Sequence, residues 1–148
     1  MLVADIMVAD VVTCDADATV RTAGRRMLDR GVGSVVVVRD DAPVGILTET
    51  DAVRTGVVTD RPFDDVTVRE AASHPVVTTR GDVTVRKAVS RMTEAGIKKL
   101  PVVEDAELVG IVTRSDVASH YREFVREAHA LDDRRADWES RRSPEEFR

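Results

Sequence analysis

An internal duplication constrains the fold of this chain more than any other feature of its sequence. Residues 12–53 align without a gap on residues 77–118, so that each residue is aligned with the one 65 positions later. Identical pairs run through the whole alignment, among them Val20 with Val85, and Gly45 with Gly110. Because units of about 60 residues are marginally stable alone, we expect the two copies to depend on each other for folding.

Each copy predicts the element order strand, helix, strand, strand, helix. In the first copy a helix is expected between Thr19, a candidate N-cap, and Gly31, a candidate C-cap. β-Branched runs and an intervening turn predict three strands in the first copy, over residues 11–14, 35–38 and 44–47, and a helix over residues 48–54. The second copy predicts strands over residues 76–78, 100–103 and 108–112, a helix over 84–95, and a further helix from near Ser115.

These patterns divide the chain into four parts. We predict a first repeat over residues 1–57, a linker over 58–65, a second repeat over 66–121, and a C-terminal part over 122–148. The start of the last part carries apolar residues at helical spacing, which can extend the last helix by two turns to Leu131. Beyond Asp132 charges of both signs crowd together, so we expect a charged tail that is mobile, or ordered only against a partner.

Composition excludes several classes of function. A net charge of −5 argues against a nucleic-acid-binding protein, because phosphate affinity comes from clustered Lys and Arg. The single cysteine, Cys14, allows no internal disulfide and reads as a small buried hydrophobic residue. The three histidines lack metal-ligand spacing, so no metal is expected. Without an apolar span or a leader, the chain is expected in the cytoplasm and not in a membrane.

Three pairs of segments carry a resemblance to a known family. The copies open with VADIMVADVVTC and VREAASHPVVTT, continue with GVGSVVVV and GIKKLPVV, and close with GILTETD and GIVTRSD. In this order and spacing, over about residues 3–120, the segments resemble the tandem cystathionine-beta-synthase (CBS) module, or Bateman module. The resemblance implies an α+β fold, in which two pseudo-symmetric βαββα repeats pack through their sheets and leave two clefts between them.

The resemblance also implies a function. Such modules are regulatory rather than catalytic, require no cofactor, and bind an adenine nucleotide such as AMP, ADP or ATP, or S-adenosylmethionine, as a regulatory ligand. They usually pair into homodimers. A chain that carries only this module must act on a separate effector protein, which the sequence does not identify.

The closing segments contain the candidate ligand-binding residues. The first turn of a helix presents unpaired N–H groups, and nearby hydroxyls and a carboxylate can bind a phosphate and a ribose. In both copies the same residue types could instead be plain helix caps. The candidates are Thr48, Thr50 and Asp51 in the first copy, and Thr113, Arg114, Ser115 and Asp116 in the second.

Four further residues complete the candidate site. Lys98 and Lys99 precede an expected buried strand and can contact a phosphate, although a solvated lysine pair is the alternative. Ser34 stands where the second copy has Lys99. The resemblance places main-chain groups near Thr13 and Thr78 beside the edge of the base.

Two other classes of function remain to be weighed. An enzyme is disfavoured, because the sequence has no nucleophile beside a base, no phosphate-binding loop and no metal cluster. A structural or protein-interaction module with empty clefts shares the expected fold and stays open as the alternative.

Overall fold

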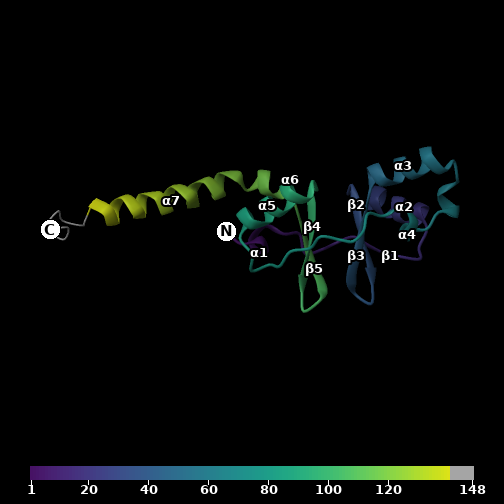
Figure 1. The fold of residues 1–148 in the computed structure, drawn as a ribbon, viewed down its shortest axis with the longest axis horizontal. Coiled ribbons are helices and arrows are strands. Elements are labelled where there is room, and N and C mark those ends of the chain that lie inside the picture. Colours follow the sequence, from purple (N-terminus) through teal and green to yellow (C-terminus); the bar gives the residue numbers. More distant parts are fainter. Residues whose placement is uncertain (141–148) are drawn as a thin grey trace.

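The computed structural model describes residues 1–140 as two mixed helix-and-sheet units side by side, with a long helix leaving the second unit (Figure 1). The first unit contains β1 (Thr13–Asp15), α2 (Val20–Arg30), β2 (Ser34–Arg39), β3 (Ala42–Thr48) and α3 (Glu49–Thr59). The second contains α5 (Val85–Ala95), β4 (Lys99–Glu104), β5 (Glu107–Thr113) and α6 (Arg114–Ser119). The remaining elements are α1 (Val3–Ile6), η1 (Phe63–Asp65), α4 (Val68–Ala71) and α7 (Tyr121–Ser140). The predicted α+β fold with two pseudo-symmetric repeats is confirmed.

Equivalent caps bound the first long helix of each unit. The Thr19 hydroxyl accepts a hydrogen bond from the amide of Thr22 (3.1 Å), and Thr84 does the same for the equivalent residue of α5. Gly31 and Gly96 end these helices in the left-handed conformation, with φ of +64° and +65°. Each helix buries its apolar stripe against its own sheet, although Leu28 is 84% exposed. The predicted helix ends are confirmed.

The sheets of the two units differ, because one residue differs between the copies. In the first unit β1 pairs in parallel with β2, and the amide of Val36 donates to the carbonyl of Val12 (3.0 Å). The equivalent of Val36 is Pro101, which has no N–H group to donate. The strand predicted at residues 76–78 is therefore wrong: only an isolated bridge between Thr79 and Val102 remains there.

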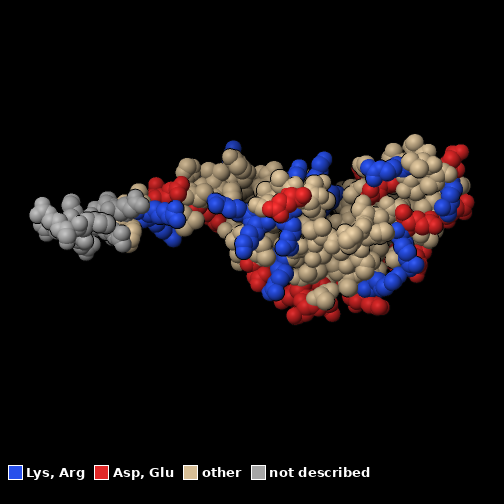
Figure 2. Space-filling model, viewed as in Figure 1, with Lys and Arg blue, Asp and Glu red and all other residues tan. Residues whose placement is uncertain are grey.

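Both hairpins end in two-residue turns of the same kind. Asp40 and Asp41 connect β2 to β3, Asp105 and Ala106 connect β4 to β5, and all four have positive φ. Such turns match the right-handed twist of the strands they join. Acidic side chains gather at these tips, along the lower edge of the molecule in Figure 2.

Replacement of Ala106 by Gly is expected to stabilise the protein. Ala106 has φ of +65°, a conformation that costs an L-residue about 1–2 kcal/mol and glycine nothing. After the larger entropy loss of glycine, the free energy of unfolding should rise by about 0.5–1 kcal/mol in urea denaturation. The matched control is Ala95→Gly, in helix α5, which should lower it by about 1 kcal/mol. Equal losses in both variants would contradict the turn assignment.

The opening segments of the two repeats are exchanged between the units. Val3 and Ile6 of α1 are buried in the core of the second unit, beside Met92 and Leu100. The backbone joins them there as well, since the amide of Val3 donates to the carbonyl of Val83 (2.9 Å). Reciprocally, α4 enters the core of the first unit.

The exchange is reciprocal in detail. Val68 and Ala72 pack in the first core with Met27 and Leu47, and the amide of Val68 donates to the carbonyl of Ala18 (2.7 Å). This hydrogen bond is the pseudo-symmetric copy of the one made by Val3. Each core therefore contains residues from both halves of the sequence, so neither half contains a complete core.

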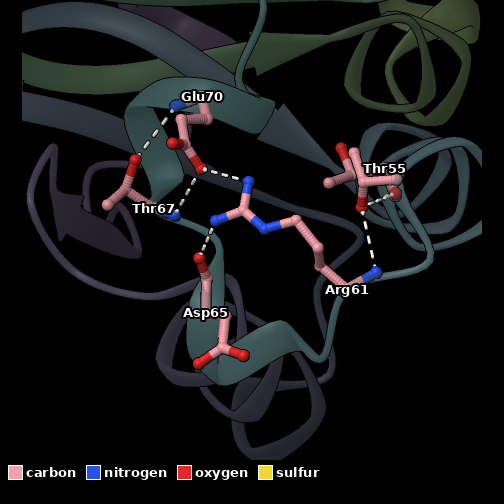
Figure 3. Close-up of polar contacts among 6 residues, drawn as sticks. Thr55, Arg61, Asp65, Thr67 and Glu70 are labelled. Atoms are coloured by element: carbon pink, nitrogen blue, oxygen red, sulfur yellow. Dashed lines mark hydrogen bonds and ion pairs between the residues drawn. The ribbon is translucent and has the colours of Figure 1, made fainter.

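The segment between the repeats is tied to α4 by an arginine. Helix α3 continues to Thr59, past the predicted start of the linker, and η1 follows. The guanidinium of Arg61 donates to the carbonyl of Asp65 and to a carboxylate oxygen of Glu70 (3.5 Å; Figure 3). Glu70 in turn accepts a hydrogen bond from the amide of Thr67, the N-cap of α4. This network fixes where the exchanged segment begins.

The C-terminal helix runs farther than predicted. Helix α7 extends from Tyr121 to Ser140, whereas the sequence predicted two helical turns ending near Leu131. Residues 141–148 of the predicted mobile tail lie outside the described residues. Among residues 1–140, no helix combines the length and the apolar character that crossing a membrane requires.

Candidate functional site

A cavity of about 400 Å³ lies between the two units and is lined by both. The first unit contributes the N-terminal side of β2, the end of β3 and the first turn of α3. The second contributes the turn after α5, which contains Lys98, and the first residue of β4, Lys99. Of the predicted ligand-binding residues, four line this cavity: Thr48, Thr50, Lys98 and Lys99.

The first turn of α3 presents hydroxyl groups to the cavity. Thr48 is the N-cap, and its hydroxyl accepts a hydrogen bond from the amide of Asp51 (3.1 Å). The Asp51 carboxylate accepts one from the amide of Thr48 (3.0 Å), which completes a capping box. The expected capping role is therefore present, and Thr48 and Thr50 also line the cavity.

Asp51 is buried and is hydrogen-bonded to Ser73, a residue of the exchanged segment that lines the cavity. Asp51 is 6% exposed, and its second carboxylate oxygen accepts hydrogen bonds from Ser73 Oγ and from Arg54, each at 3.4 Å. Ser73 lines the cavity, and its backbone pairs with that of Ile46 in β3. The opening segment of the second repeat thus forms part of the wall next to the closing segment of the first.

Lys99 connects the two repeats within this site. Its Nζ donates a hydrogen bond to Ser34 Oγ (3.1 Å), the side chain at the equivalent position of the first copy. Burial lowers the pKa of Lys99 below its usual value, while the carboxylates of Glu49 and Asp116 act in the opposite direction. The ammonium is therefore partly desolvated, and an anion entering the cavity would find a cation that water screens less than a surface lysine.

The second closing segment forms a similar helix start that does not line this cavity. The Asp116 carboxylate accepts hydrogen bonds from the amide (2.8 Å) and the hydroxyl (2.9 Å) of Thr113. Arg114 and Ser115 are exposed.

The backbone around the two helix starts keeps the pseudo-symmetry of the repeats. The amide of Arg114 donates to the carbonyl of Lys98 (3.0 Å), as the amide of Glu49 does to the carbonyl of Gly33 (3.1 Å). On the face of the molecule that Figure 2 shows, Lys and Arg side chains are mixed with acidic ones around a largely uncharged centre.

Thr13 and Thr78 lie outside the lining of the cavity. Their carbonyl groups accept hydrogen bonds from Arg26 and Arg91, both at 2.6 Å and both from the first long helix of their own unit. These arginines hold β1 and the equivalent segment around Thr78 against the helices. The main-chain groups that were expected to contact the base are therefore not among the residues that line this cavity.

The remaining predictions concern cysteine and metal ligands. Cys14 is 1% exposed, and burial raises the pKa of its thiol, so it is a small core residue as predicted. Within residues 1–140 no group of three His, Cys, Asp or Glu side chains converges on a possible metal position.

The sequence reasoning missed several residues of the site. Ser73 and Glu49 line the cavity, and so do the apolar side chains of Ile46 and Ile97. The signal for Glu49 was present, because it lies inside the motif GILTETD. Ser73 had no such signal, since its place depends on the exchange of opening segments.

Comparison with known proteins places this arrangement in a family. The model of the CBS domain matches the chain twice, over residues 3–60 and 68–123. A protein of Methanopyrus kandleri is 38% identical over 78% of this chain and 60% of its own length. YlbB of Bacillus subtilis is 30% identical over 87% of this chain and 88% of its own length. The chain thus spans somewhat less than two thirds of the Methanopyrus protein.

A solved structure has the same fold. The CBS domain pair of protein MJ0100, solved in complex with 5′-methylthioadenosine and S-adenosyl-L-methionine, superposes with a TM-score of 0.75 at 24% identity. The match covers 83% of this chain and 97% of that one. Two family matches, arranged in tandem on two interlocked units, identify this chain as a member of the CBS domain family with a pair of CBS domains.

Proposed function

We propose that this chain is a regulatory module that binds an adenine nucleotide in the cavity between its repeats and signals to a separate effector protein. The observation that carries the proposal is the convergence of Thr48, Thr50, Lys98 and Lys99 on one cavity of about 400 Å³. This volume falls within the usual range for small-molecule sites, about 300–1,000 Å³. Hydroxyls from one repeat and ammonium groups from the other therefore surround the same space.

The proposed roles follow from the chemistry of each group. Lys98 and Lys99 bind phosphate oxygens, and the Thr48 and Thr50 hydroxyls donate to the same phosphate at the positive end of α3. The Asp51 carboxylate accepts ribose hydroxyls, in exchange for its long hydrogen bonds to Ser73 and Arg54. The apolar side chains of Ile46 and Ile97 pack against the base.

The second cleft is proposed as a weaker site. Thr113, Arg114, Ser115 and Asp116 would bind there opposite Ser34, with main-chain groups near Thr13 or Thr78 beside the base. That cleft has Gly33 and Ser34 where the first has Lys98 and Lys99. Since an uncharged pair replaces two ammonium groups, a phosphate should bind less tightly in the second cleft. We infer one high-affinity site per chain.

The choice of ligand class is supported by the relative solved with bound ligands. The CBS pair of MJ0100 was solved with two adenosine compounds, 5′-methylthioadenosine and S-adenosyl-L-methionine. Both are adenosine compounds without a phosphate group, so they support the adenosine part of the ligand, and AMP, ADP, ATP and S-adenosylmethionine remain the candidates. The two lysines favour those with phosphate groups.

Ligand binding would act on the contact between the repeats. Lys99 now bridges to Ser34 of the first repeat, and a phosphate would compete for its ammonium. A ligand shifts an equilibrium between two arrangements only by its difference in affinity for them. The exchange of this bridge for a ligand-mediated one supplies such a difference.

Isothermal titration with AMP, ADP, ATP and S-adenosylmethionine tests the proposal. At least one should bind with a micromolar dissociation constant, equivalent to about −8 kcal/mol, at one high-affinity site per chain. It should raise the melting temperature of the protein, whereas adenosine, which lacks the phosphate, should raise it less. An unchanged melting temperature with every compound at millimolar concentration would exclude the proposed function.

One observation favours the alternative of an interaction module with empty clefts. Helix α3 exposes three valines, Val53, Val57 and Val58, at 63%, 77% and 76%. Such apolar surface is compatible with a protein partner. Affinity for a partner that is independent of every nucleotide would favour this alternative. The homodimer and the cytoplasmic location stay predictions.

A further inference from the structure

A second cavity lies at the opposite end of the β2–β3 hairpin from the cavity between the repeats. Its volume is about 280 Å³, and its rim carries three basic side chains, those of Arg39, Arg69 and His74. The rest of its lining is small and apolar and comes from β2, β3, α4 and the segment before α2: Ala16, Val37, Val44, Gly45 and Ala72. Gly45 and the carbonyl of Ser73 lie in close contact beneath it, since a Cβ at Gly45 would be 3.1 Å from that oxygen.

The basic groups of this rim retain hydrogen-bonding capacity. The guanidinium of Arg39 makes no hydrogen bond or ion pair with any of residues 1–140. Arg69 uses Nη2 for Asp17 (2.6 Å), which leaves its other guanidinium nitrogens without a partner among the same residues. His74 Nε2 lies 3.1 Å from the carbonyl of Arg69, and a carbonyl only accepts, so this nitrogen donates its hydrogen there, and the two arginines supply the donors that an anion would meet.

The duplication provides an internal comparison for this cavity. The equivalent cavity of the second unit, about 310 Å³, includes Gly81, Val103, Val109 and Met7 in its lining. At the positions equivalent to Arg39, Arg69 and His74 the second unit has Glu104, Ala4 and Ala9, the last two from the exchanged opening segment of the first repeat. The one arginine on its rim, Arg80, is bonded to Asp82 through two contacts of 3.1 and 3.0 Å.

Comparison of the two cavities shows which features the fold requires and which are left to serve binding. Both units build a cavity at this place with the same backbone, so the fold itself does not require basic residues there. The basic rim, with an unpaired guanidinium at Arg39, occurs in one unit only and surrounds an apolar floor, while the other unit has Glu104 at the place of Arg39. Repulsion between Arg39 and Arg69 is a cost that an anion at the rim would remove.

We propose that the cavity under Arg39, Arg69 and His74 binds a small organic anion, a carboxylate or a phosphate ester with a compact apolar group. Guanidinium groups match the planar geometry of carboxylate and phosphate oxygens and bind them through two parallel hydrogen bonds. The apolar group occupies the floor between Val37, Val44 and Ala72. This site is separate from the nucleotide cavity and does not depend on the proposed function.

Phenyl phosphate is a suitable probe, because it combines an anion with a compact ring. In a ¹⁵N-labelled sample of the full chain, titration should shift the amide signals of Val37, Gly45 and Ala72. Arg39→Glu, which copies Glu104 of the second unit, should weaken binding at least tenfold. Arg80→Glu, at the rim of the equivalent cavity, is the matched control and should leave the affinity unchanged. Equal affinity in both variants and in the unchanged protein would overturn the proposal.

Two further measurements keep this site distinct from the nucleotide site. Lys98→Glu, in the cavity between the repeats, should leave phenyl phosphate binding intact. If Lys98→Glu removes phenyl phosphate binding and Arg39→Glu does not, the basic rim is not a site, whatever the fate of the nucleotide proposal. Inorganic phosphate should bind at least tenfold more weakly than phenyl phosphate, and equal affinities would overturn the role of the apolar floor.

Discussion

Replacement of Val68 by Asp is expected to unfold the first repeat, although Val68 follows the first repeat in the sequence. Its side chain is 0% exposed and lies in the core of the first unit through the exchanged segment. Burial of an unpaired carboxylate costs several kcal/mol, a large part of the 5–15 kcal/mol that stabilises a typical domain. Urea denaturation followed by circular dichroism should show a loss of at least about 3 kcal/mol or no cooperative transition.

Hydrogen exchange shows which part of the protein Val68→Asp destabilises. In Val68→Asp, protection should fall first in the amides of the first core, at Cys14, Val35 and Leu47. The control is Leu28→Asp on the same unit, whose side chain is 84% exposed and whose replacement should cost less than about 0.5 kcal/mol. Loss of protection confined to residues 85–112 would contradict the exchange of opening segments.

The exchange also marks the limit of what the sequence predicts about the fold. The caps of α2 and α5, from Thr19 to Gly31 and from Thr84 to Gly96, are local signals and were predicted. So were both hairpins. The partner of α1 is not a local property, because Val3 is apolar enough for either core. The lost strand at residues 76–78 was predictable from Pro101, which withdraws the donor that Val36 supplies.

The residues of the candidate site also fall into those that local sequence signals predict and those that depend on how the repeats are arranged in space. Thr48 and Thr50 were found from the composition of one helix start, and Lys98 and Lys99 from their position before a buried strand. The second motif has the same residue types and the same capping box, but Thr113 and Asp116 lie outside the cavity. Only the spatial relation of the repeats distinguishes the two motifs. Ser73 was missed because it belongs to an exchanged segment, whose position in space is not a local property of the sequence.

The cavity between the repeats predicts the largest effect of a single substitution on ligand binding, at Lys98. Lys98→Glu places a carboxylate where the proposal has an ammonium bound to phosphate, so a charge-assisted hydrogen bond is lost and a repulsion is added. The hydrogen bond alone contributes about 1.5–3 kcal/mol, so the affinity for the phosphate-bearing nucleotide should fall at least 100-fold. Titration calorimetry at one fixed ionic strength measures this ratio.

Lys87 makes the comparison specific to the site, because it is the one lysine besides Lys98 and Lys99. It lies exposed on α5, away from the cavity lining, and Lys87→Glu changes the net charge by the same amount. If long-range attraction were the cause, both variants would lose affinity alike and more salt would abolish the difference from the unchanged protein. If Lys98 contacts the phosphate, the Lys98→Glu deficit persists at high salt and Lys87→Glu binds normally. Equal losses in the two variants would therefore remove Lys98 from the site and leave the nucleotide without its proposed cation.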